Sequence, residues 1–115
     1  MSTAKKRAAL LGHIGRQAAS AVQGSLAEVY VRCGSPSCAC HRDPEKRHGP
    51  HLYLKYKDPR GRSTGMYVPR EHEAEMRRAV EAWAELRESI VAVAQLNRGE
   101  LHERLRRRKD VPAGR

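Results

Sequence analysis

The stretch CGSPSCACHRDPEKRHGPH, residues 33–51, decides how this chain folds. It spaces three cysteines and one histidine as C-x4-C-x-C-x7-H. Thiolate sulfur and imidazole nitrogen are the ligands that zinc takes in tetrahedral structural sites. We therefore predict a structural zinc site that holds a small sheet together. The predicted ligands are Cys33, Cys38, Cys40 and His48.

Local geometry favours these four ligands. Glycine and proline after Cys33 bend the chain back toward the second cysteine. Cys38 and Cys40 are two residues apart, so extended backbone would point both side chains to one side. The polar loop 41–47 then leaves His48 free to complete the shell.

Other interpretations of the stretch stay open. His41 or His51 would serve as the fourth ligand in place of His48. Basic neighbours lower the pKa of a thiol, so redox-sensitive cysteines are a second possibility, and ordinary buried thiols a third. Disulfides are disfavoured, because three cysteines cannot all pair within one chain and the expected compartment is reducing.

A catalytic zinc is not expected. Such a site keeps an open coordination position and usually a nearby carboxylate base. The local acids Asp43 and Glu45 fall in a polar loop, and no nucleophile–base pair is visible elsewhere. We expect no catalytic residue and no enzymatic activity.

The flanking sequence predicts an α+β fold. Apolar residues at helical spacing over 3–22 predict an N-terminal helix. Residues 26–32, 51–57 and 63–68 are β-branched, aromatic or alternating, and predict a three-stranded antiparallel sheet with a turn at Asp58–Gly61.

A long helix should follow the sheet. Pro69 suits a first helical turn, and the helical pattern runs to about Asn97, where Gly99 should interrupt it before a weaker helical piece. The expected segments are a basic N-terminal helix (1–24), a zinc-binding hairpin module (25–69), a long amphipathic helix (70–98) and a basic C-terminal tail (99–115).

The run YVRCGSPSCACH…HGPHLYL…YVPRE resembles a bacterial and archaeal family of small domains of unknown function. Its pattern is RCG-x-P-x-C-x-C, then HGPY, a short hairpin and YVP-[KR]-E before a long helix. The resemblance covers residues 24–98 and implies the fold and the zinc site, but no reaction. His51 stands where the family usually has tyrosine. Such domains occur in mobile-element and phage contexts, which implies an accessory role there.

The charge of the chain indicates a polyanionic partner. Lys and Arg number 23 against 13 Asp and Glu, a net charge of +10, and only residues 70–98 are nearly neutral. Nucleic acid is the usual partner of such a chain, although charge also serves solubility. We favour DNA, while RNA and sequence specificity stay undecided. The expected contacts are Arg32, Tyr53, Lys55, Lys57, Arg60, Arg62, Arg106, Arg107, Arg108 and Lys109.

A heptad-like stripe on the long helix predicts self-association. Apolar residues repeat at three- and four-residue spacing and end in an asparagine, which can fix register in a coiled coil. The predicted seam is Met76, Ala79, Trp83, Leu86, Ile90, Val93 and Asn97. We favour a homodimer. The alternatives are packing of the stripe within its own chain and an adaptor that binds another protein without touching nucleic acid.

The expected location is the cytoplasm. The basic N-terminus has only a short apolar part, interrupted by Gly12 and Gly15, and lacks a signal-peptide core. No stretch approaches the roughly 20 apolar residues that span a bilayer.

Overall fold

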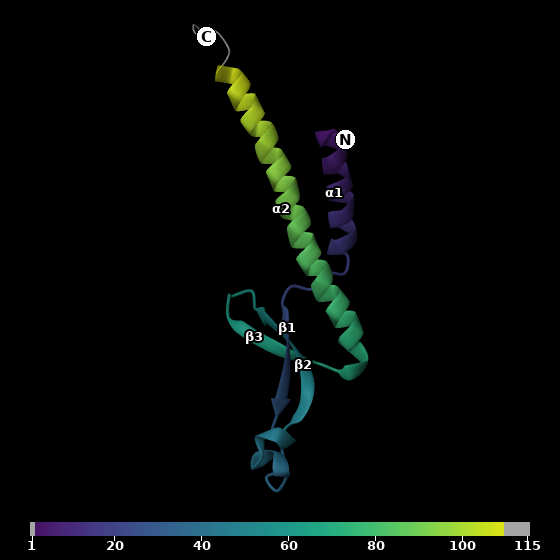
Figure 1. Cartoon of the computed structure of the whole chain (residues 1–115), viewed down its shortest axis with the longest axis vertical. Coiled ribbons are helices and arrows are strands. Elements are labelled where there is room, and N and C mark those ends of the chain that lie inside the picture. Colours follow the sequence, from purple (N-terminus) through teal and green to yellow (C-terminus); the bar gives the residue numbers. More distant parts are fainter. Residues whose placement is uncertain (1, 110–115) are drawn as a thin grey trace. The chain divides into compact units, whose positions relative to one another are not determined.

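The computed structural model describes residues 2–109, the last of them by its backbone alone. Its helices and strands are α1 (Thr3–Ala18), β1 (Ser25–Val31), β2 (His48–Lys57), β3 (Ser63–Val68) and α2 (Glu73–Lys109), joined in part by 3-10 turns η1 (Ala39–His41), η2 (Pro44–Lys46) and η3 (Arg70–His72) (Figure 1). The predicted α+β fold, with an N-terminal helix, a three-stranded antiparallel sheet and a long C-terminal helix, is confirmed. None of the described helices is long and apolar enough to cross a membrane.

The chain forms two compact units, and α2 contributes to both. One unit spans Ala21–Trp83 and contains the sheet and the start of α2. The other combines the chain up to Ser20 with the chain from Ala84 onward, and so contains α1 and most of α2.

The sheet has the order β1-β2-β3, and both strand pairs are antiparallel (Figure 1). Alternation along β2 puts Leu52 and Leu54 on one face, where they form the core with Val68 of β3. These three side chains are at most 3% exposed. The partly buried residues that pack against them are Val22, Leu26, Tyr56, Met76 and Val80. On the opposite face, called the open face below, Tyr53 is half-buried and Lys55 and Tyr67 are exposed.

Two glycines allow β1 to approach β2 closely. Gly24 has φ +149° and Gly49 has φ +143°, a region that side chains rarely adopt. A Cβ on Gly49 would lie 2.7 Å from the carbonyl oxygen of Val29, where the β1–β2 register shifts. Any other residue at Gly49 would push the strands apart beside His48, the first residue of β2.

The turn predicted at Asp58–Gly61 joins β2 to β3. Asp58 organises it: Oδ1 accepts from the backbone N–H groups of Arg60 and Arg62, and Oδ2 accepts from Nε of Arg62, each at 2.9 Å. The backbone N–H of Arg62 contributes most to lowering the pKa of Asp58, with its guanidinium and the Arg60 N–H acting the same way. The carboxylate therefore stays charged and holds two basic residues at the tip of the hairpin.

In the other unit, α1 lies antiparallel beside α2 (Figure 1). Near the start of α1, Arg7 donates to Oδ1 of Asn97 at 3.0 Å and pairs with Glu100. Near its end, Gln17 donates to Glu85 at 2.5 Å. Early residues of one helix thus meet late residues of the other.

The predicted boundaries of the N-terminal helix were too wide. Ser2 caps α1 by accepting from the backbone of Lys5 at 3.2 Å, but the helix ends at Ala18 rather than residue 22. The backbone N–H of Val22 instead donates to the carbonyl of Ala79 at 3.0 Å, because this segment already belongs to the sheet unit.

The prediction that Gly99 interrupts the long helix was wrong. α2 begins at Glu73, after a 3-10 turn that follows Pro69, and it continues through Gly99 to Lys109. A single glycine costs a helix only about 1 kcal/mol relative to alanine. Contacts from α1 on either side of the glycine, to Asn97 and Glu100, offset that cost.

Part of the predicted seam is used within the chain. Met76 packs on the sheet core, Leu86 is buried with 8% exposure, and Asn97 accepts a hydrogen bond from Arg7. Ala79, Trp83 and Val93 are half-buried, while Ile90 is exposed. The homodimer through this seam stays a prediction, and the intramolecular contacts match the alternative of packing within one chain.

We expect Gly99→Ala to stabilise the paired helices by about 1 kcal/mol. No atom lies within 4 Å of a Cβ added at Gly99, so the substitution gains helix propensity without a clash. Urea unfolding followed by circular dichroism measures the change. Gly24→Ala is the control of opposite sign, because its positive φ and the 2.8 Å approach to the Lys55 carbonyl predict destabilisation. A loss of stability in Gly99→Ala would contradict a continuous α2.

Candidate metal centre

The four predicted ligands come from the ends of two strands and the turn between them. Cys33 follows the end of β1, Cys38 precedes η1, Cys40 lies within η1, and His48 begins β2. The sequence predicted extended backbone from Cys38 to Cys40, and this prediction holds for Cys38 only. Cys38 is extended, but its carbonyl accepts from the backbone N–H of His41 at 3.1 Å and closes a 3-10 turn.

His48 is positioned by the fold rather than by a free loop. It pairs with Val31 in the β1–β2 ladder, so the strand sets its backbone position. The preceding loop contains η2, which begins with Pro44 and is capped by Asp43 accepting from the backbone of Glu45 at 3.0 Å. The expected freedom of residues 41–47 is therefore not observed.

The ligand atoms of Cys33, Cys38, Cys40 and His48 all lie within 4.8 Å of one another. Sγ of Cys40 is 3.5 Å from Sγ of Cys33, and Sγ of Cys38 is 3.4 Å from Nε2 of His48. Tetrahedral zinc with sulfur at about 2.3 Å places neighbouring sulfur atoms about 3.8 Å apart. The observed spacing therefore fits a single metal ion held by three thiolates and one imidazole.

The surroundings of Cys40 and Cys38 shift the pKa values of their thiols in opposite directions. Cys40 is fully buried, and this burial raises the pKa of its thiol. Cys38 is less buried, and the backbone N–H of Cys40, with a further contribution from His48, lowers its pKa to about 6. The backbone N–H of Cys33 donates to Sγ of Cys40 at 3.3 Å, and such bonds stabilise sulfur as a thiolate ligand.

The two alternative histidines lie elsewhere. Nε2 of His41 donates to the carbonyl oxygen of Cys33 at 2.8 Å, so it supports the backbone of a ligand. His51 lies against Tyr67, with ring centroids 5.8 Å apart. Arg47 adds a second support by donating to the carbonyl of Cys40 at 3.1 Å. The structure thus groups His48, and neither alternative, with the three cysteines.

An aromatic cluster lies on the open face of the sheet, opposite the core. Tyr53 and Tyr67 are cross-strand partners with ring centroids 5.8 Å apart, and His51 completes the cluster. Lys55 and Lys57 follow Tyr53 at every second position of β2, so they lie on the same face, where both are exposed. The predicted contacts include Tyr53 but not Tyr67 or His51, which share its face of the sheet. The hairpin register places Tyr67 opposite Tyr53.

The other predicted nucleic-acid contacts are more scattered. Arg32 is exposed beyond the end of β1, and Arg60 and Arg62 are exposed on the β2–β3 turn. The predicted contacts on α2 belong to the other unit; there Arg106 pairs with Glu103 at 3.4 Å, and Arg107 and Arg108 are exposed. The side chain of Lys109 and residues 110–115 lie outside the described part of the chain.

A family model matches this chain, whereas no curated protein and no solved structure does. A family model described as "Domain of unknown function (DUF6788)" matches residues 5–78, from α1 through the sheet and metal centre into the start of α2. The match includes α1, which the resemblance over residues 24–98 did not. Since it covers more than half of the 115 residues, the chain belongs to the family "Domain of unknown function (DUF6788)".

Proposed function

We propose that this is a structural-zinc protein that binds nucleic acid, favouring DNA, through the open face of its sheet. The zinc assignment is supported by the donor set, because three soft thiolates and one imidazole in tetrahedral spacing are typical of structural zinc. Four protein ligands fill a tetrahedral shell and leave no position for a substrate. Zinc here would supply stability to the hairpin and no reaction.

The observation that carries the nucleic-acid proposal is the aromatic cluster of Tyr53, Tyr67 and His51 beside Lys55 and Lys57. The exposed ring of Tyr67 and the half-buried rings of Tyr53 and His51 would offer stacking surfaces to unpaired bases, and the flanking lysines would neutralise the phosphates that connect them. Tyr67 is 49% exposed, although a large aromatic side chain gains from burial when a core is available. The sequence contains no recognised base-reading helix, so the proposed binding is only weakly sequence-selective.

The proposed wider role is that of an accessory factor of a mobile element or phage. Its support is the resemblance to domains found in those systems.

We expect Tyr53→Ala and Tyr67→Ala each to weaken binding to a single-stranded oligonucleotide by at least fivefold. One stacked base contributes about 1–3 kcal/mol, whereas duplex DNA has no unpaired base to stack and should lose little. Fluorescence anisotropy with labelled single-stranded DNA, duplex DNA and RNA at low salt measures the effect. Tyr53→Phe is the matched control, because it keeps the ring and should bind as the wild type does. Equal affinity in wild type and both alanine variants would contradict stacking on this face.

The second candidate function is an adaptor that binds another protein and not nucleic acid. Exposed apolar side chains on α2, among them Val91, Leu101 and Leu105, favour it. Absence of measurable binding to all three nucleic acids at 50 mM salt would favour the adaptor and refute the first proposal.

A further inference from the structure

Strand β3 forms one edge of the sheet and is paired on one side only. The sheet order places it beside β2, and within residues 2–109 no other strand pairs with it (Figure 1). Its first five residues are exposed, and only Val68 is buried. Met66 and Tyr67 are 45% and 49% exposed. A strand edge in this state offers free backbone N–H and C=O groups to another strand.

The hairpin geometry defines which backbone groups of β3 are free. The backbone N–H of Asp58 donates to the carbonyl oxygen of Arg62 at 2.8 Å, so these two residues form a hydrogen-bonded pair. Hydrogen-bonded and non-hydrogen-bonded pairs alternate along an antiparallel ladder. In the observed register, positions 64, 66 and 68 therefore bond to β2. Ser63, Gly65 and Tyr67 instead point their backbone N–H and C=O groups away from β2.

Strand β3 lacks the features that protect exposed strand edges. Natural edges carry charged residues, prolines or bulges that discourage pairing with another chain. The segment Ser63–Val68 contains no charged residue and no proline, although the whole chain has a net charge of +10. It pairs with β2 residue for residue. The other edge strand, β1, contains Glu28 and shifts its register between Val29 and Val31. β3 is therefore the edge suited to pairing.

We propose that two copies of this chain pair through their β3 edges, antiparallel and with Gly65 on the twofold axis, to form one continuous sheet. Gly65 of one copy then lies opposite Gly65 of the other, and Ser63 of each copy lies opposite Tyr67 of the other. The two residues of such a pair exchange both of their backbone hydrogen bonds. This register therefore satisfies the outward backbone groups of all three residues.

The side chains of β3 are complementary to those of a second copy in this register. On the core face, the exposed Met66 of one copy lies beside Thr64 of the other. On the open face, the large Tyr67 lies beside the small Ser63, and Gly65 leaves the axis free of side chains. No pair within the strand sets two charges against each other. A second copy of this chain therefore fits the edge.

The neighbouring registers fit less well. A pairing centred on Met66 would place Ser63 opposite Pro69, which has no N–H to donate. A pairing centred on Thr64 would place Tyr67 opposite Gly61, which lies in the turn before the strand with φ +82°. Only the register centred on Gly65 keeps every outward backbone group opposite a strand residue.

The basic residues nearest the strand lie beyond its ends. Arg62 pairs with Asp58 at 2.9 Å, whereas Arg60 and Arg70 lie on the turn and in η3. Two copies of a chain with net charge +10 repel each other, and salt screens this repulsion. An edge of six residues is also small for a stable interface. We therefore expect a weak, micromolar dimer that becomes tighter as salt rises.

The inference goes beyond the proposed function and does not rest on it. Pairing uses backbone groups of β3, whereas the proposed stacking uses the ring of Tyr67. Salt separates the two, because it weakens nucleic-acid binding and should strengthen this association.

The test is sedimentation velocity of the full-length protein, free of nucleic acid, over a range of concentrations. Gly65→Lys and Gly65→Glu should each weaken dimerisation at least fivefold, because each sets like charges opposite one another at the axis. An equimolar mixture of the two variants should associate at least fivefold more tightly than either variant alone, because lysine then faces glutamate. A Cβ at Gly65 would lie 3.4 Å from the Leu54 carbonyl oxygen, an ordinary contact that β3 can accommodate.

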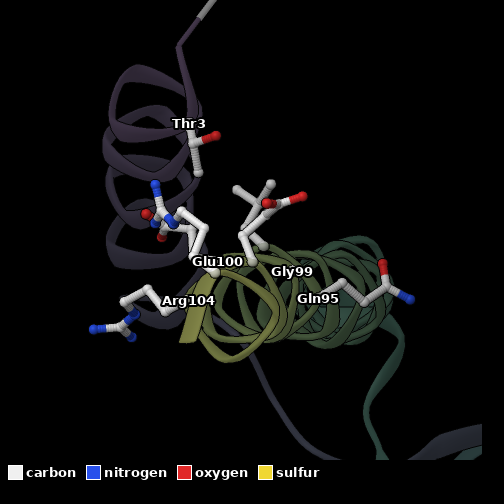
Figure 2. A pocket seen from close by; sticks show the side chains of 8 residues that line it. Thr3, Gln95, Gly99, Glu100 and Arg104 are labelled. Carbon is white, nitrogen blue, oxygen red and sulfur yellow. The ribbon is translucent and has the colours of Figure 1, made fainter. Parts of the chain in front are cut away.

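Gly99 provides the matched control for a change of charge outside the sheet. Figure 2 shows it on α2, in the groove of about 510 Å³ that Thr3 of α1 also lines, and no atom lies within 4 Å of a Cβ added there. Gly99→Lys and Gly99→Glu should dimerise as the wild type does, alone or mixed.

Two further controls address the register and the fold. Mixing Ser63→Lys with Ser63→Glu should add no affinity over either variant alone, because Ser63 faces Tyr67 and not its own counterpart. Far-UV circular dichroism and thermal unfolding check that each Gly65 variant stays folded, and recovery of the dimer in the Gly65 mixture shows the same directly.

Several results would overturn the proposal. One is a wild type that stays monomeric at about 500 µM in high salt, whatever other strand the edge then binds. Another is a dimer that Gly65→Lys leaves intact, and a third is a Gly65 mixture no tighter than its components. A dimer that Ile90→Glu removes and Gly65→Lys does not would assign the association to the predicted seam of α2 instead.

Discussion

Replacing Cys40 with serine is expected to remove the metal and to unfold the hairpin that it joins. Cys40 is fully buried, and its sulfur lies 3.5 Å from that of Cys33. Binding of structural zinc contributes about 10–16 kcal/mol in small zinc domains, and that free energy is part of their folding free energy. Whole domains are stable by only about 5–15 kcal/mol, so loss of the metal exceeds what the small core of Leu52, Leu54 and Val68 can replace.

Metal analysis of protein purified without added metal should give about one zinc per chain, and Cys40→Ser should give almost none. Hydrogen exchange should then show loss of protection in β1 and β2, whose ends carry the ligands. Helix α1 and the part of α2 from Ala84 onward belong to the other unit and should keep their protection. Far-UV circular dichroism of wild type in excess chelator should show the same partial unfolding.

His41→Ala is the matched control for this experiment. It removes the hydrogen bond to the Cys33 carbonyl but no ligand atom. Loss of such an outer contact typically weakens metal affinity about 10–100-fold, so the variant should still fold with zinc in excess. Protein that stays folded in chelator with less than a tenth of an equivalent of zinc would refute the structural role of the metal.

The ligand set could be predicted from the sequence because spacing limits which side chains can meet. Three cysteines within eight residues and one histidine at the next strand leave few tetrahedral arrangements. The choice of His48 over His51 was harder. It depends on which face of β2 each side chain occupies, and only the ladder that pairs Val31 with His48 and Val29 with His51 defines that.

Two features of the helices could not be predicted from local pattern. Gly99 looked like a helix end because propensity is a local property, whereas α1 supports α2 through residues about 90 positions earlier in the chain. The use of the predicted seam depends on what covers it, which the sequence pattern does not give. Met76 packs on the sheet core and Asn97 meets Arg7, and neither contact has a signal in the spacing of the stripe.

The last prediction concerns the salt dependence of duplex DNA binding. If about six basic side chains reach phosphates, the slope of log affinity against log salt should be near −5, at about −0.9 per contact. Raising salt from 50 to 200 mM would then weaken binding by roughly a thousandfold. The expected contacts are Lys55, Lys57, Arg60 and Arg62 on the hairpin, together with arginines of α2.

Replacing these four hairpin residues by alanine should flatten the slope to about −1.5, since each lost contact removes about 0.9. Affinity for all duplex sequences should fall alike, because phosphates carry no sequence information. Arg62 already contacts Asp58 through Nε, yet its side chain is 70% exposed. The single variant Arg62→Ala therefore tests whether Arg62 also contacts a phosphate. The control is Arg70→Ala, Arg78→Ala, which removes exposed charge from the start of α2 and η3 and should leave the slope near −5. A slope that the hairpin substitutions leave unchanged would mean that the open sheet face does not contact DNA. Duplex binding would then depend on basic residues elsewhere in the chain, among them the arginines of α2.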